Sequence, residues 1–397
     1  MLIGHWAAGS GLARVLTQIA LELNLHADVR ILGLVPAGGR AAAVPVGVDT
    51  HPVPQAGPRF QVTPSALHHH ITEFQPYDVI VVGPLFLTMP LLDELQPFRD
   101  SGRLTTYLPV EGEIVGSIPL VLFDLVDICI LYTEDSRRRL AALAGAAGVP
   151  ARTRLEVVGH GVDTELFHPA LTSANEVRRR LFPDRPDLVD SFLVLNSNRA
   201  YPRKRLDLTI NGFADFARQV SGAYLYLNAC GLSGEDRAAL EVTVDGAGIT
   251  GRVLINHLNP DGSPLPDETL GLLYNACEVG VSTSMGEGWG LGTFEHAATG
   301  AAQIVPGHTS FVENWQGAAA LLPPVSRTHI FYEYSDMLEV SAAALTTELH
   351  RLHDDRDLLQ RMAQAAYQRA IEPRYHWDEV GRRIHHILGI TVAPDDA

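Results

Sequence analysis

Short runs of apolar residues alternate along this chain with longer segments in which apolar residues recur every three or four positions. The short runs match buried parallel strands, and the longer segments match amphipathic helices. In the first part of the chain, strands are expected at residues 1–6, 28–35, 77–83, 104–109 and 126–132, and helices at 12–25, at 65–74 and from 133 onward. The strand, helix, strand order at the start predicts a βαβ opening and a parallel sheet.

The alternation starts again in the second half. Strands are expected at residues 192–196, 224–228, 252–256, 279–282, 303–305 and 319–322. Helices fit between them at residues 206–220, 235–247, 267–276 and 291–299, and a Ser-x-x-Glu capping box at Ser310 and Glu313 predicts the start of another. This pattern predicts a second doubly wound sheet, whose ligands bind outside the carboxyl ends of the strands.

A charged run at residues 176–190 separates the two patterns and indicates a domain boundary near residue 170. We therefore predict an α/β protein with two Rossmann-like doubly wound domains, at residues 1–168 and 169–375, and a last segment at 376–397 that contains a helix at 378–388. Residues 37–58 are expected to be an irregular connection, and residues 332–370 to be helical.

Composition and charge narrow the class of protein. The chain has 397 residues, of which 46% are hydrophobic and 19% charged, and a net charge of −16 that argues against a nucleic-acid partner. The three cysteines are widely spaced, which favours neither a disulfide framework nor a zinc site and suits a reducing cytoplasm. No signal peptide and no apolar run of about 18 residues is expected, although peripheral membrane contact stays open.

Three other polar clusters have structural interpretations. The consecutive histidines His68, His69 and His70 would splay around a helix, so no metal site is predicted there. The basic triplet at residues 137–139 most simply solvates the outer face of its helix, or contacts an acceptor. The acidic string at residues 354–357 is expected to supply charge at a helix N-terminus.

The chemistry concentrates in a turn at residues 286–295 between a predicted strand and a predicted helix. Backbone N–H groups and a helix N-terminus can bind phosphate there without a positively charged side chain. Glu287 lies in the turn and Glu295 one helical turn in; by itself Glu295 could be a plain N-terminal helix charge. Two carboxylates beside a phosphate cradle are better suited to accept hydrogen bonds from hydroxyl groups on either side of a diphosphate. The remaining candidates for donor binding in this turn are Gly288, Trp289, Gly290, Leu291 and Gly292.

A basic cluster follows the first strand of the second half. Arg199, Arg203, Lys204 and Arg205 lie within seven residues of an otherwise acidic chain. Arginine offers a planar fork to phosphate oxygens and lysine a compact charge, so the cluster is a candidate diphosphate clamp. The alternative is an ordinary basic surface turn.

The Glu-x7-Glu spacing of Glu287 and Glu295, with Gly-Trp-Gly-Leu inside, resembles the donor motif of the retaining GT-B glycosyltransferases, family four in particular. Arg199 and Lys204 resemble the diphosphate clamp of that family, and His160–Phe167 resembles its Asn-Gly-Val-Asp-Thr-x-x-Phe signature, with histidine in place of asparagine. From the residues alone, Gly161 would be a turn glycine and Asp163 a helix cap.

The resemblance implies two domains around a cleft and a last helix that packs on the first domain. In that family the second glutamate binds the ribose and the first lies against the transferred sugar, which implies these roles for Glu295 and Glu287. The loop with Gly9 and Gly11 would face the donor, although it could also be a tight turn, and His257 and Leu258 would lie near the base.

One position departs from the family. Many relatives carry a histidine near the acceptor where this chain has Pro109-Val-Glu-Gly-Glu113, and Glu111 is the nearest polar group. Glu111 is therefore a candidate for orienting the acceptor or accepting its proton. The alternative is that Glu111 is an ordinary acidic residue in a solvent-exposed turn.

The sequence thus predicts a retaining glycosyltransferase that uses a nucleotide-diphosphate-sugar as co-substrate, with no other cofactor and no metal. Arg199, Lys204, Glu287 and Glu111 are the candidate catalytic residues. Retention could arise through an enzymic nucleophile or through same-face substitution. The acceptor could be a small molecule, a glycan or a lipid-linked sugar, and the oligomeric state is open. The alternatives are a nucleotide-sugar epimerase or sugar phosphorylase on the same fold, and a non-catalytic nucleotide-sugar-binding protein.

Overall fold

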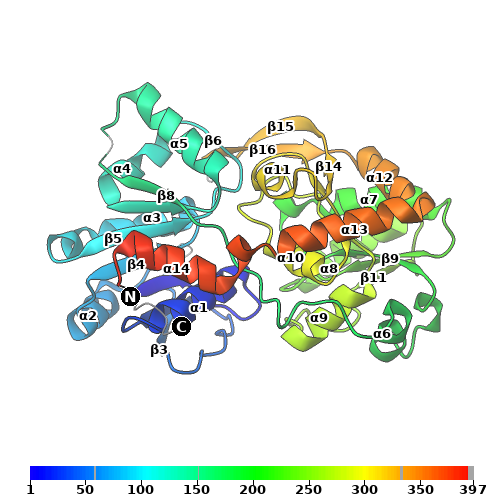
Figure 1. Cartoon of the computed structure of the whole chain (residues 1–397), viewed down its shortest axis with the longest axis horizontal. Coiled ribbons are helices and arrows are strands. Elements are labelled where there is room, and N and C mark those ends of the chain that lie inside the picture. The colour runs from blue at the N-terminus through cyan, green and yellow to red at the C-terminus, as the bar shows by residue number, and fades with distance from the viewer. Residues whose placement is uncertain (58–59, 151, 331–333, 392–397) are drawn as a thin grey trace. The chain divides into compact units, whose positions relative to one another are not determined.

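A computed structural model describes residues 1–57, 60–150, 152–330 and 334–391 (Figure 1). The chain divides into two compact units. Unit 1 comprises Met1–Gly161, His329–Asp336 and Arg374–Ala397, and unit 2 comprises Val162–Thr328 and Met337–Pro373. Of the last segment, residues 392–397 lie outside the described residues.

Unit 1 is built on a seven-stranded sheet in the order β3-β2-β1-β4-β5-β7-β8. Every neighbouring pair in it is parallel. Its strands are β1 (Leu2–His5), β2 (Arg30–Val35), β3 (Asp49–Pro54), β4 (Asp78–Val82), β5 (Arg103–Leu108), β7 (Ile128–Leu131) and β8 (Arg154–Val157). Most of these strands are buried apolar runs, which is why the sequence pattern reveals them.

The helices of unit 1 include those predicted at 12–25, at 65–74, from 133 onward and at 378–388, together with α3 and α4, which were not predicted from the sequence. They are α1 (Gly11–Asn24), α2 (Pro64–Phe74), α3 (Leu85–Glu94), α4 (Leu122–Leu125), α5 (Glu134–Ala147) and α14 (Trp377–Leu388), with 3-10 turns η1 (Gln96–Asp100) and η2 (Ile118–Val121). On α5 the basic triplet is engaged in ion pairs, with Arg137 on Glu134 and Arg139 on both Asp135 and Glu113.

Unit 2 contains a six-stranded parallel sheet in the order β11-β10-β9-β12-β13-β14. Its strands are β9 (Phe192–Asn196), β10 (Ala223–Leu227), β11 (Val253–Ile255), β12 (Val279–Val281), β13 (Ala302–Pro306) and β14 (Ala320–Leu322). The strand order reverses between β9 and β12, so the connections on either side of that point cover opposite faces of the sheet. The two α/β sheets confirm the predicted fold class.

The helices of unit 2 surround a large apolar core that includes Phe213, Phe216 and Leu345. They are α6 (Ala174–Leu181), α7 (Leu206–Ala217), α8 (Gly234–Gly246), α9 (Asp267–Ala276), α10 (Leu291–Ala298), α11 (Ser310–Trp315), α12 (Ala342–Asp354) and α13 (Arg356–Ala370), with 3-10 turns η3 (Pro186–Leu188) and η4 (Pro202–Lys204). A further 3-10 turn, η6 (Pro373–Tyr375), begins at the last residue of unit 2 and continues into unit 1. The acidic string caps a helix as predicted, because the side chain of Asp355 accepts a hydrogen bond of 2.8 Å from the Leu358 amide.

Two of the sequence predictions about local structure are wrong. Residues 37–58 include the edge strand β3, whose residues are largely exposed and so lack a continuous apolar run. The segment expected to be helical at 332–370 is helical in α12 and α13, but its residues 335–340 form the strand β16 (Ser335–Val340), and residues 332 and 333 lie outside the described residues. The strand joins β15 (Pro324–Ile330) and β6 (Glu113–Ile114) in a three-stranded sheet. Short strands that pair with distant segments leave little periodicity in the sequence.

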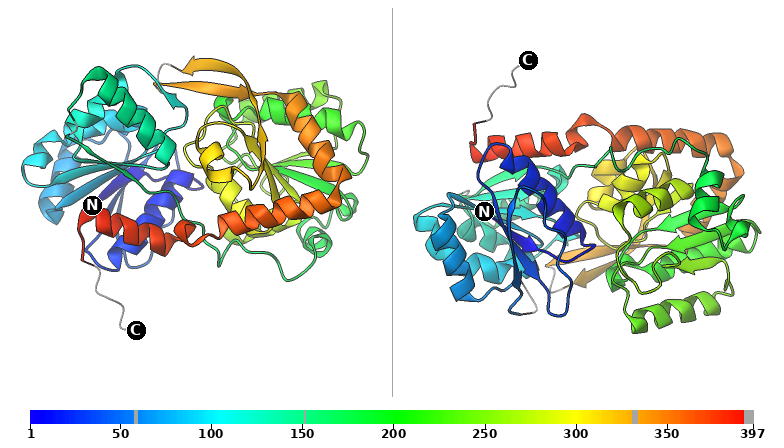
Figure 2. Two further views of the ribbon diagram at one scale, coloured as in Figure 1. Left: turned by 45° about the horizontal axis from the view of Figure 1, so that its top comes forward. Right: turned by 90° about the horizontal axis from the view of Figure 1, so that it is seen from below.

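The last helix packs in unit 1, where α14 lies beside α1 (Figure 2). Arginine side chains bind its C-terminal end, since Arg103 Nη2 donates to the Leu388 carbonyl at 2.5 Å and Arg154 Nη2 to the Ile387 carbonyl at 2.9 Å. Cations at this position satisfy unpaired carbonyls and complement the helix dipole. These contacts tie residues more than 200 positions apart in the chain.

Several histidines are buried in the folded chain. His296 of α10 is 2% exposed, and its Nε2 lies 3.2 Å from the Cys277 carbonyl oxygen. Burial lowers its pKa from 6.5 to about 4, although carbonyl contacts act in the opposite direction. Burial also lowers the pKa of His308 to about 4 and that of His160 to about 3. These side chains are therefore neutral in the native protein at pH 7.

We predict that the melting temperature falls as the pH is lowered from 6.5 towards 4. The unfolded chain takes up protons on these histidines in that range while the native chain does not, so stability is complete above pH 6.5 and is lost on acidification, by about 1.4 kcal/mol per pH unit for each fully buried histidine. His296→Gln should flatten the fall, measured by thermal unfolding at stepped pH, whereas the matched change at exposed His68, His68→Gln, should leave it as steep as in the wild type. An unchanged pH profile in His296→Gln would contradict this account.

Candidate active site

The carboxyl ends of β9 and β12 meet at the point where the second sheet reverses its strand order. The two strands are parallel neighbours, with Val279 paired with Val194. The basic turn at 197–205 follows β9, and the glycine-rich turn at 285–290 follows β12. Adjacent parallel strands deliver the loops after them to the same edge, so the sheet itself brings the two predicted motifs together.

An ion pair joins the two turns. The ammonium of Lys204, the only lysine of the sequence, lies on the carboxylate of Glu287. The side chains are 9% and 15% exposed. Burial alone would raise the pKa of Glu287, but the nearby charges of Lys204 and Arg203 outweigh it and lower this pKa below the ordinary value. Glu287 is therefore a carboxylate at neutral pH.

Backbone contacts fix the two turns to each other around this pair. Arg203 Nη1 donates to the Gly286 carbonyl at 2.9 Å, and the Arg203 carbonyl accepts from the Met285 amide at 2.8 Å. Thr283 Oγ1 donates to the Arg205 carbonyl at 2.8 Å. The Arg205 guanidinium pairs with Asp207 and Glu339. Arg203 and Arg205 thus support the turns, while Lys204 contacts the acidic side chain.

The glycine-rich turn ends in the N-terminus of α10. Gly290 is the N-cap with φ of +91°, and a Cβ there would lie 2.8 Å from Phe311 Cε1, so only glycine fits. The amides of Leu291 and Gly292 lie in the first turn, where a helix has no internal acceptors for them. Trp289 is buried and stacks on Phe294, with ring centroids 5.0 Å apart. The turn is therefore rigid and presents its amides at the positive end of a helix.

Glu295 is more deeply buried than a charged side chain on the exposed face of a helix would be. Its side chain is on α10, the residue is 5% exposed, and Oε2 accepts a hydrogen bond of 3.2 Å from the Tyr274 hydroxyl. The same hydroxyl lies 3.4 Å from Ser197 Oγ at the end of β9. Burial of a carboxylate costs free energy unless the group is hydrogen-bonded or paired with a charge. The burial of Glu295 therefore favours a ligand-binding group over a solvated helix charge.

Arg199 is half-buried beside Tyr201. Its Nη1 lies 3.4 Å from the Tyr201 hydroxyl, and its guanidinium carbon lies 6.0 Å from the Tyr201 ring centroid. Of the two cations of the predicted clamp, Lys204 is thus the one that the structure brings onto Glu287.

The predicted capping box at Ser310 is wrong. Thr309 is the N-cap of α11, and Ser310 Oγ instead donates to the Glu287 carbonyl at 2.6 Å. Thr309 has φ of +50° and ψ of −141°, a region that costs a β-branched residue about 1–3 kcal/mol. The sequence gives no sign of this contact, because it joins residues 23 positions apart through a loop of unusual backbone. Ser310, at the start of α11 after β13, thus positions the glycine-rich turn that follows β12.

The other residues predicted for the site lie in separate parts of the chain. In unit 2, His257 pairs with Asp184 at 3.1 Å, and the Leu258 amide donates to the Tyr226 hydroxyl at 2.9 Å, so this amide already has an acceptor. In unit 1, Gly9 has φ of +69° and Gly11 begins α1. Glu111 follows β5 in unit 1, and burial together with the Glu111 charge raises the pKa of Tyr132. The roles of these candidates stay predictions.

The part of the signature-like segment that lies in unit 1, His160 and Gly161, has a structural role there. His160 is buried, and its Nδ1 lies 2.8 Å from the Tyr107 hydroxyl, which itself donates to the Gly159 carbonyl at 2.6 Å. Gly161 is not a turn glycine: a Cβ there would lie 2.5 Å from Trp377 Cδ2, so glycine is needed for close packing. Asp163, in unit 2, caps a single turn rather than a helix by accepting from the amides of Glu165 and Leu166.

Nowhere in the described part of the chain do three or more His, Cys, Asp or Glu side chains form a group suited to a metal ion. Within the same ranges, no helix has both the length and the apolar character that crossing a bilayer requires.

Comparison with known proteins identifies the fold. No family model and no curated protein matches the sequence. Sucrose-phosphate synthase from Thermosynechococcus elongatus is similar in structure, with a TM-score of 0.73, 16% identity and 98% of each chain covered. HepE of Anabaena, solved with UDP and glucose, has a TM-score of 0.70 at 14% identity over 98% of this chain and 99% of its own. The chain has the GT-B fold.

A third solved structure supports the same fold. The UDP-forming α,α-trehalose-phosphate synthase from Burkholderia xenovorans, in complex with glucose-6-phosphate, has a TM-score of 0.72 at 12% identity, and the match covers 98% of this chain and 99% of that one. At such identities the likeness establishes the fold, and the chemistry must be argued from the residues.

We predict that Lys204 and Glu287 are energetically coupled. In a double-mutant cycle of Lys204→Met and Glu287→Gln, the loss of unfolding free energy on changing both should be smaller than the sum of the single losses by about 1–3 kcal/mol, because either single change leaves a charge buried without its partner. The exposed pair Arg218 and Asp215 is the matched control and should couple by less than about 1 kcal/mol. Additive losses at Lys204 and Glu287 would contradict the ion pair.

Proposed function

We propose that this protein is a glycosyltransferase that moves a sugar from a nucleoside-diphosphate donor to an acceptor hydroxyl with retention of anomeric configuration. The observation that carries the proposal is the Lys204–Glu287 pair, formed between a basic turn and the glycine-rich N-terminus of α10. The shared fold supports it, since similar structures were solved with UDP and with UDP-glucose.

In this proposal Arg199, Lys204 and the amides of Leu291 and Gly292 bind the diphosphate. The bond between the anomeric carbon and the diphosphate oxygen breaks, a bond to the acceptor oxygen forms, and the acceptor proton leaves that oxygen. The negative charge left on the diphosphate is then stabilised by fixed cations and amide dipoles. We propose that these groups do the work that a metal ion does elsewhere.

The two glutamates would bind the hydroxyl groups on either side of the diphosphate. Glu287 is ionised, because its pKa is lowered, and an ionised carboxylate accepts hydrogen bonds from the hydroxyls of the transferred sugar. Glu295 would accept from the ribose hydroxyls, with Tyr274 orienting its carboxylate. The base would lie near His257 and Leu258, where the Leu258 amide already donates to the Tyr226 hydroxyl.

The acceptor is proposed to bind in unit 1, where Glu111 follows β5. Its carboxylate is a candidate for orienting the acceptor hydroxyl or receiving its proton. Cytoplasmic location and peripheral membrane contact stay predictions.

We predict that a nucleoside-diphosphate sugar stabilises the protein and that Lys204→Ala weakens its binding at least tenfold. A thermal-shift screen with UDP, GDP, ADP and TDP sugars measures the first effect, which grows with ligand concentration. Because Lys204 is the only lysine, an amine-specific reagent followed by peptide mass analysis gives a second readout, and bound donor should protect this side chain.

Arg218→Ala is the control for loss of a cation elsewhere in unit 2 and should bind the donor as the wild type does. Failure of every nucleotide to stabilise the wild type would refute the donor site. Turnover without an acceptor would indicate an epimerase, a requirement for inorganic phosphate a phosphorylase, and binding without any turnover a nucleotide-sugar sensor.

We also predict that Glu295 recognises the ribose. Glu295→Gln should weaken binding of the preferred nucleotide by roughly 10- to 100-fold, in line with about 1.5–3 kcal/mol for a hydrogen bond to a charged group. The same change should have little effect on the 2′,3′-dideoxy analogue, which lacks the hydroxyl groups concerned. Calorimetric titration of both nucleotides with both proteins measures this, and an equal loss for the two nucleotides would assign Glu295 a purely structural role.

A further inference from the structure

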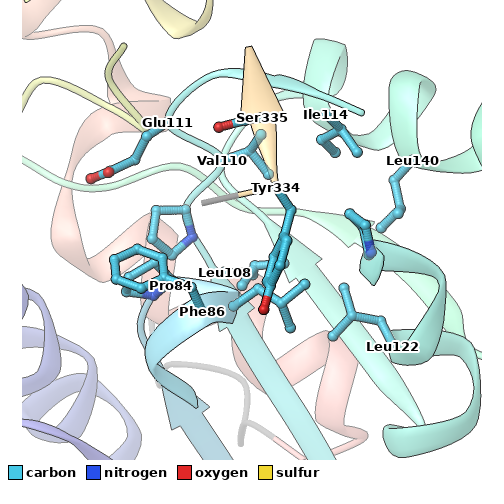
Figure 3. Close-up of a pocket in the computed structure, with 13 residues that line it drawn as sticks. Pro84, Phe86, Leu108, Val110, Glu111, Ile114, Leu122, Leu140, Tyr334 and Ser335 are labelled. Carbon is cyan, nitrogen blue, oxygen red and sulfur yellow. The ribbon is translucent and has the colours of Figure 1, made fainter. Parts of the chain in front are cut away.

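A second site lies wholly within unit 1. A pocket opens where β4 and β5 end, the edge at which parallel α/β sheets bind ligands, and its empty space, together with the part open to solvent, is about 460 Å³. Its lining comes from Pro84 and the start of α3, from the end of β5 and the loop after it, and from β6, η2, α4, α5 and the start of β16 (Figure 3). The lining residues are Pro84, Leu85, Phe86, Leu108, Pro109, Val110, Glu111, Ile114, Pro119, Leu122, Leu140, Tyr334 and Ser335.

The lining is almost entirely apolar. All but Glu111, Tyr334 and Ser335 have apolar side chains, and no lining side chain is Arg, Lys or His. Pro84, Pro109 and Pro119 also have no backbone N–H to donate. A phosphate group would find no cation here, and a polyhydroxylated sugar would lose hydrogen bonds to water that the walls cannot replace.

Distant segments fix the pocket walls. Tyr334 and Ser335 reach this position because β16 pairs antiparallel with β6, with Ser335 opposite Ile114. The Tyr334 carbonyl accepts from the Val115 amide at 3.2 Å, and a Cβ at Gly112 would lie 2.6 Å from the Asp336 carbonyl oxygen. The ring of Tyr334 projects among the apolar lining residues (Figure 3).

Two of the polar groups, those of Glu111 and Ser335, lie in one part of the pocket, while the Tyr334 hydroxyl points away from them among the apolar side chains (Figure 3). The Glu111 carboxylate lies at the edge of the apolar group, and the Ser335 hydroxyl is on the same side (Figure 3). A ligand that suits this arrangement has a compact apolar body with a hydroxyl group at one end.

We propose that this pocket binds the apolar body of the acceptor, so that the acceptor is a compact hydrophobic alcohol or phenol rather than a sugar phosphate or a free sugar. The identification of this ligand as the acceptor rests on the proposed function. The pocket's preference for apolar ligands rests only on the residues that line it. Burial of the apolar body gives affinity, and Glu111 at the edge contacts the hydroxyl group.

The test uses the full chain without a donor and 2-naphthol as the probe. Ligand-observed NMR and calorimetry measure its binding, with glucose 6-phosphate as the comparison ligand. The wild type should bind 2-naphthol and show no measurable binding of glucose 6-phosphate in this pocket. Ile114→Trp, which fills the pocket from its half-buried wall, should weaken 2-naphthol binding at least tenfold.

Val53→Trp is the matched control, because Val53 is also a half-buried residue packed against the core of unit 1 but does not line the pocket. It should bind 2-naphthol as the wild type does. A milder variant, Val110→Thr, keeps the shape of the wall and adds a hydroxyl group, and should weaken binding by a smaller factor even if Ile114→Trp fails to fold. Equal binding of 2-naphthol by wild type, Ile114→Trp and Val110→Thr would overturn the proposal, as would preferential binding of glucose 6-phosphate.

This inference and the proposed function fail in different ways. Stabilisation by a nucleotide sugar without 2-naphthol binding would overturn the acceptor inference and leave the transferase intact. Binding of 2-naphthol without stabilisation by any nucleotide sugar would refute the transferase and keep the pocket as an apolar ligand site. Transfer of sugar to 2-naphthol that Ile114→Trp abolishes, with donor binding unchanged, would support both.

Discussion

The contact between Lys204 and Glu287 is the interaction around which unit 2 is organised. It joins residues 83 positions apart, between the turn after β9 and the turn after β12. Both side chains are largely removed from water, where an unpaired charge is costly and a paired one is tolerated. An arriving diphosphate would give Lys204 a second anionic partner, while Glu287 is kept ionised to accept hydrogen bonds. The pair therefore sets the charge state of the site before any ligand binds.

Other contacts serve to fix the geometry of this pair. Arg203 binds the Gly286 carbonyl, Ser310 binds the Glu287 carbonyl, and the Phe311 ring excludes any side chain at Gly290. These residues come from three different loops at one edge of the sheet. Strain at Thr309 shows that the backbone after β13 accepts an unfavourable conformation in order to reach the Glu287 carbonyl. Preorganisation of this kind is what electrostatic stabilisation of a leaving group requires.

The two units present chemically opposite surfaces at corresponding sheet edges. Unit 2 offers cations, amides and carboxylates, which suit a nucleotide diphosphate and its hydroxyl groups. Unit 1 offers a pocket of apolar side chains and prolines with a single carboxylate, Glu111. The carboxyl edges of the two parallel sheets therefore differ in chemistry. The sheets are alike, but the loops that follow their strands carry different residues.

The sequence by itself determined most of the regular structure and the location of the two turns that meet at the proposed donor site. Buried parallel strands are continuous apolar runs, and the loops after them carry local motifs, so both sheets, the turn at 286–295 and the basic turn at 199–205 were visible from residue order. The acidic cap at Asp355 was visible for the same reason.

Only the tertiary structure decided which residues meet. The exposed edge strand β3 and the β15–β16 strands depend on pairing partners rather than on their own periodicity. Ser310 was predicted to cap a helix, but its hydroxyl donates to the Glu287 carbonyl. Gly161 was predicted to be a turn glycine, but it allows close packing against Trp377. The apolar pocket combines residues from 84 to 335. Contacts of such long range are set by how the elements pack, and that information is spread over the whole chain rather than written in any one stretch.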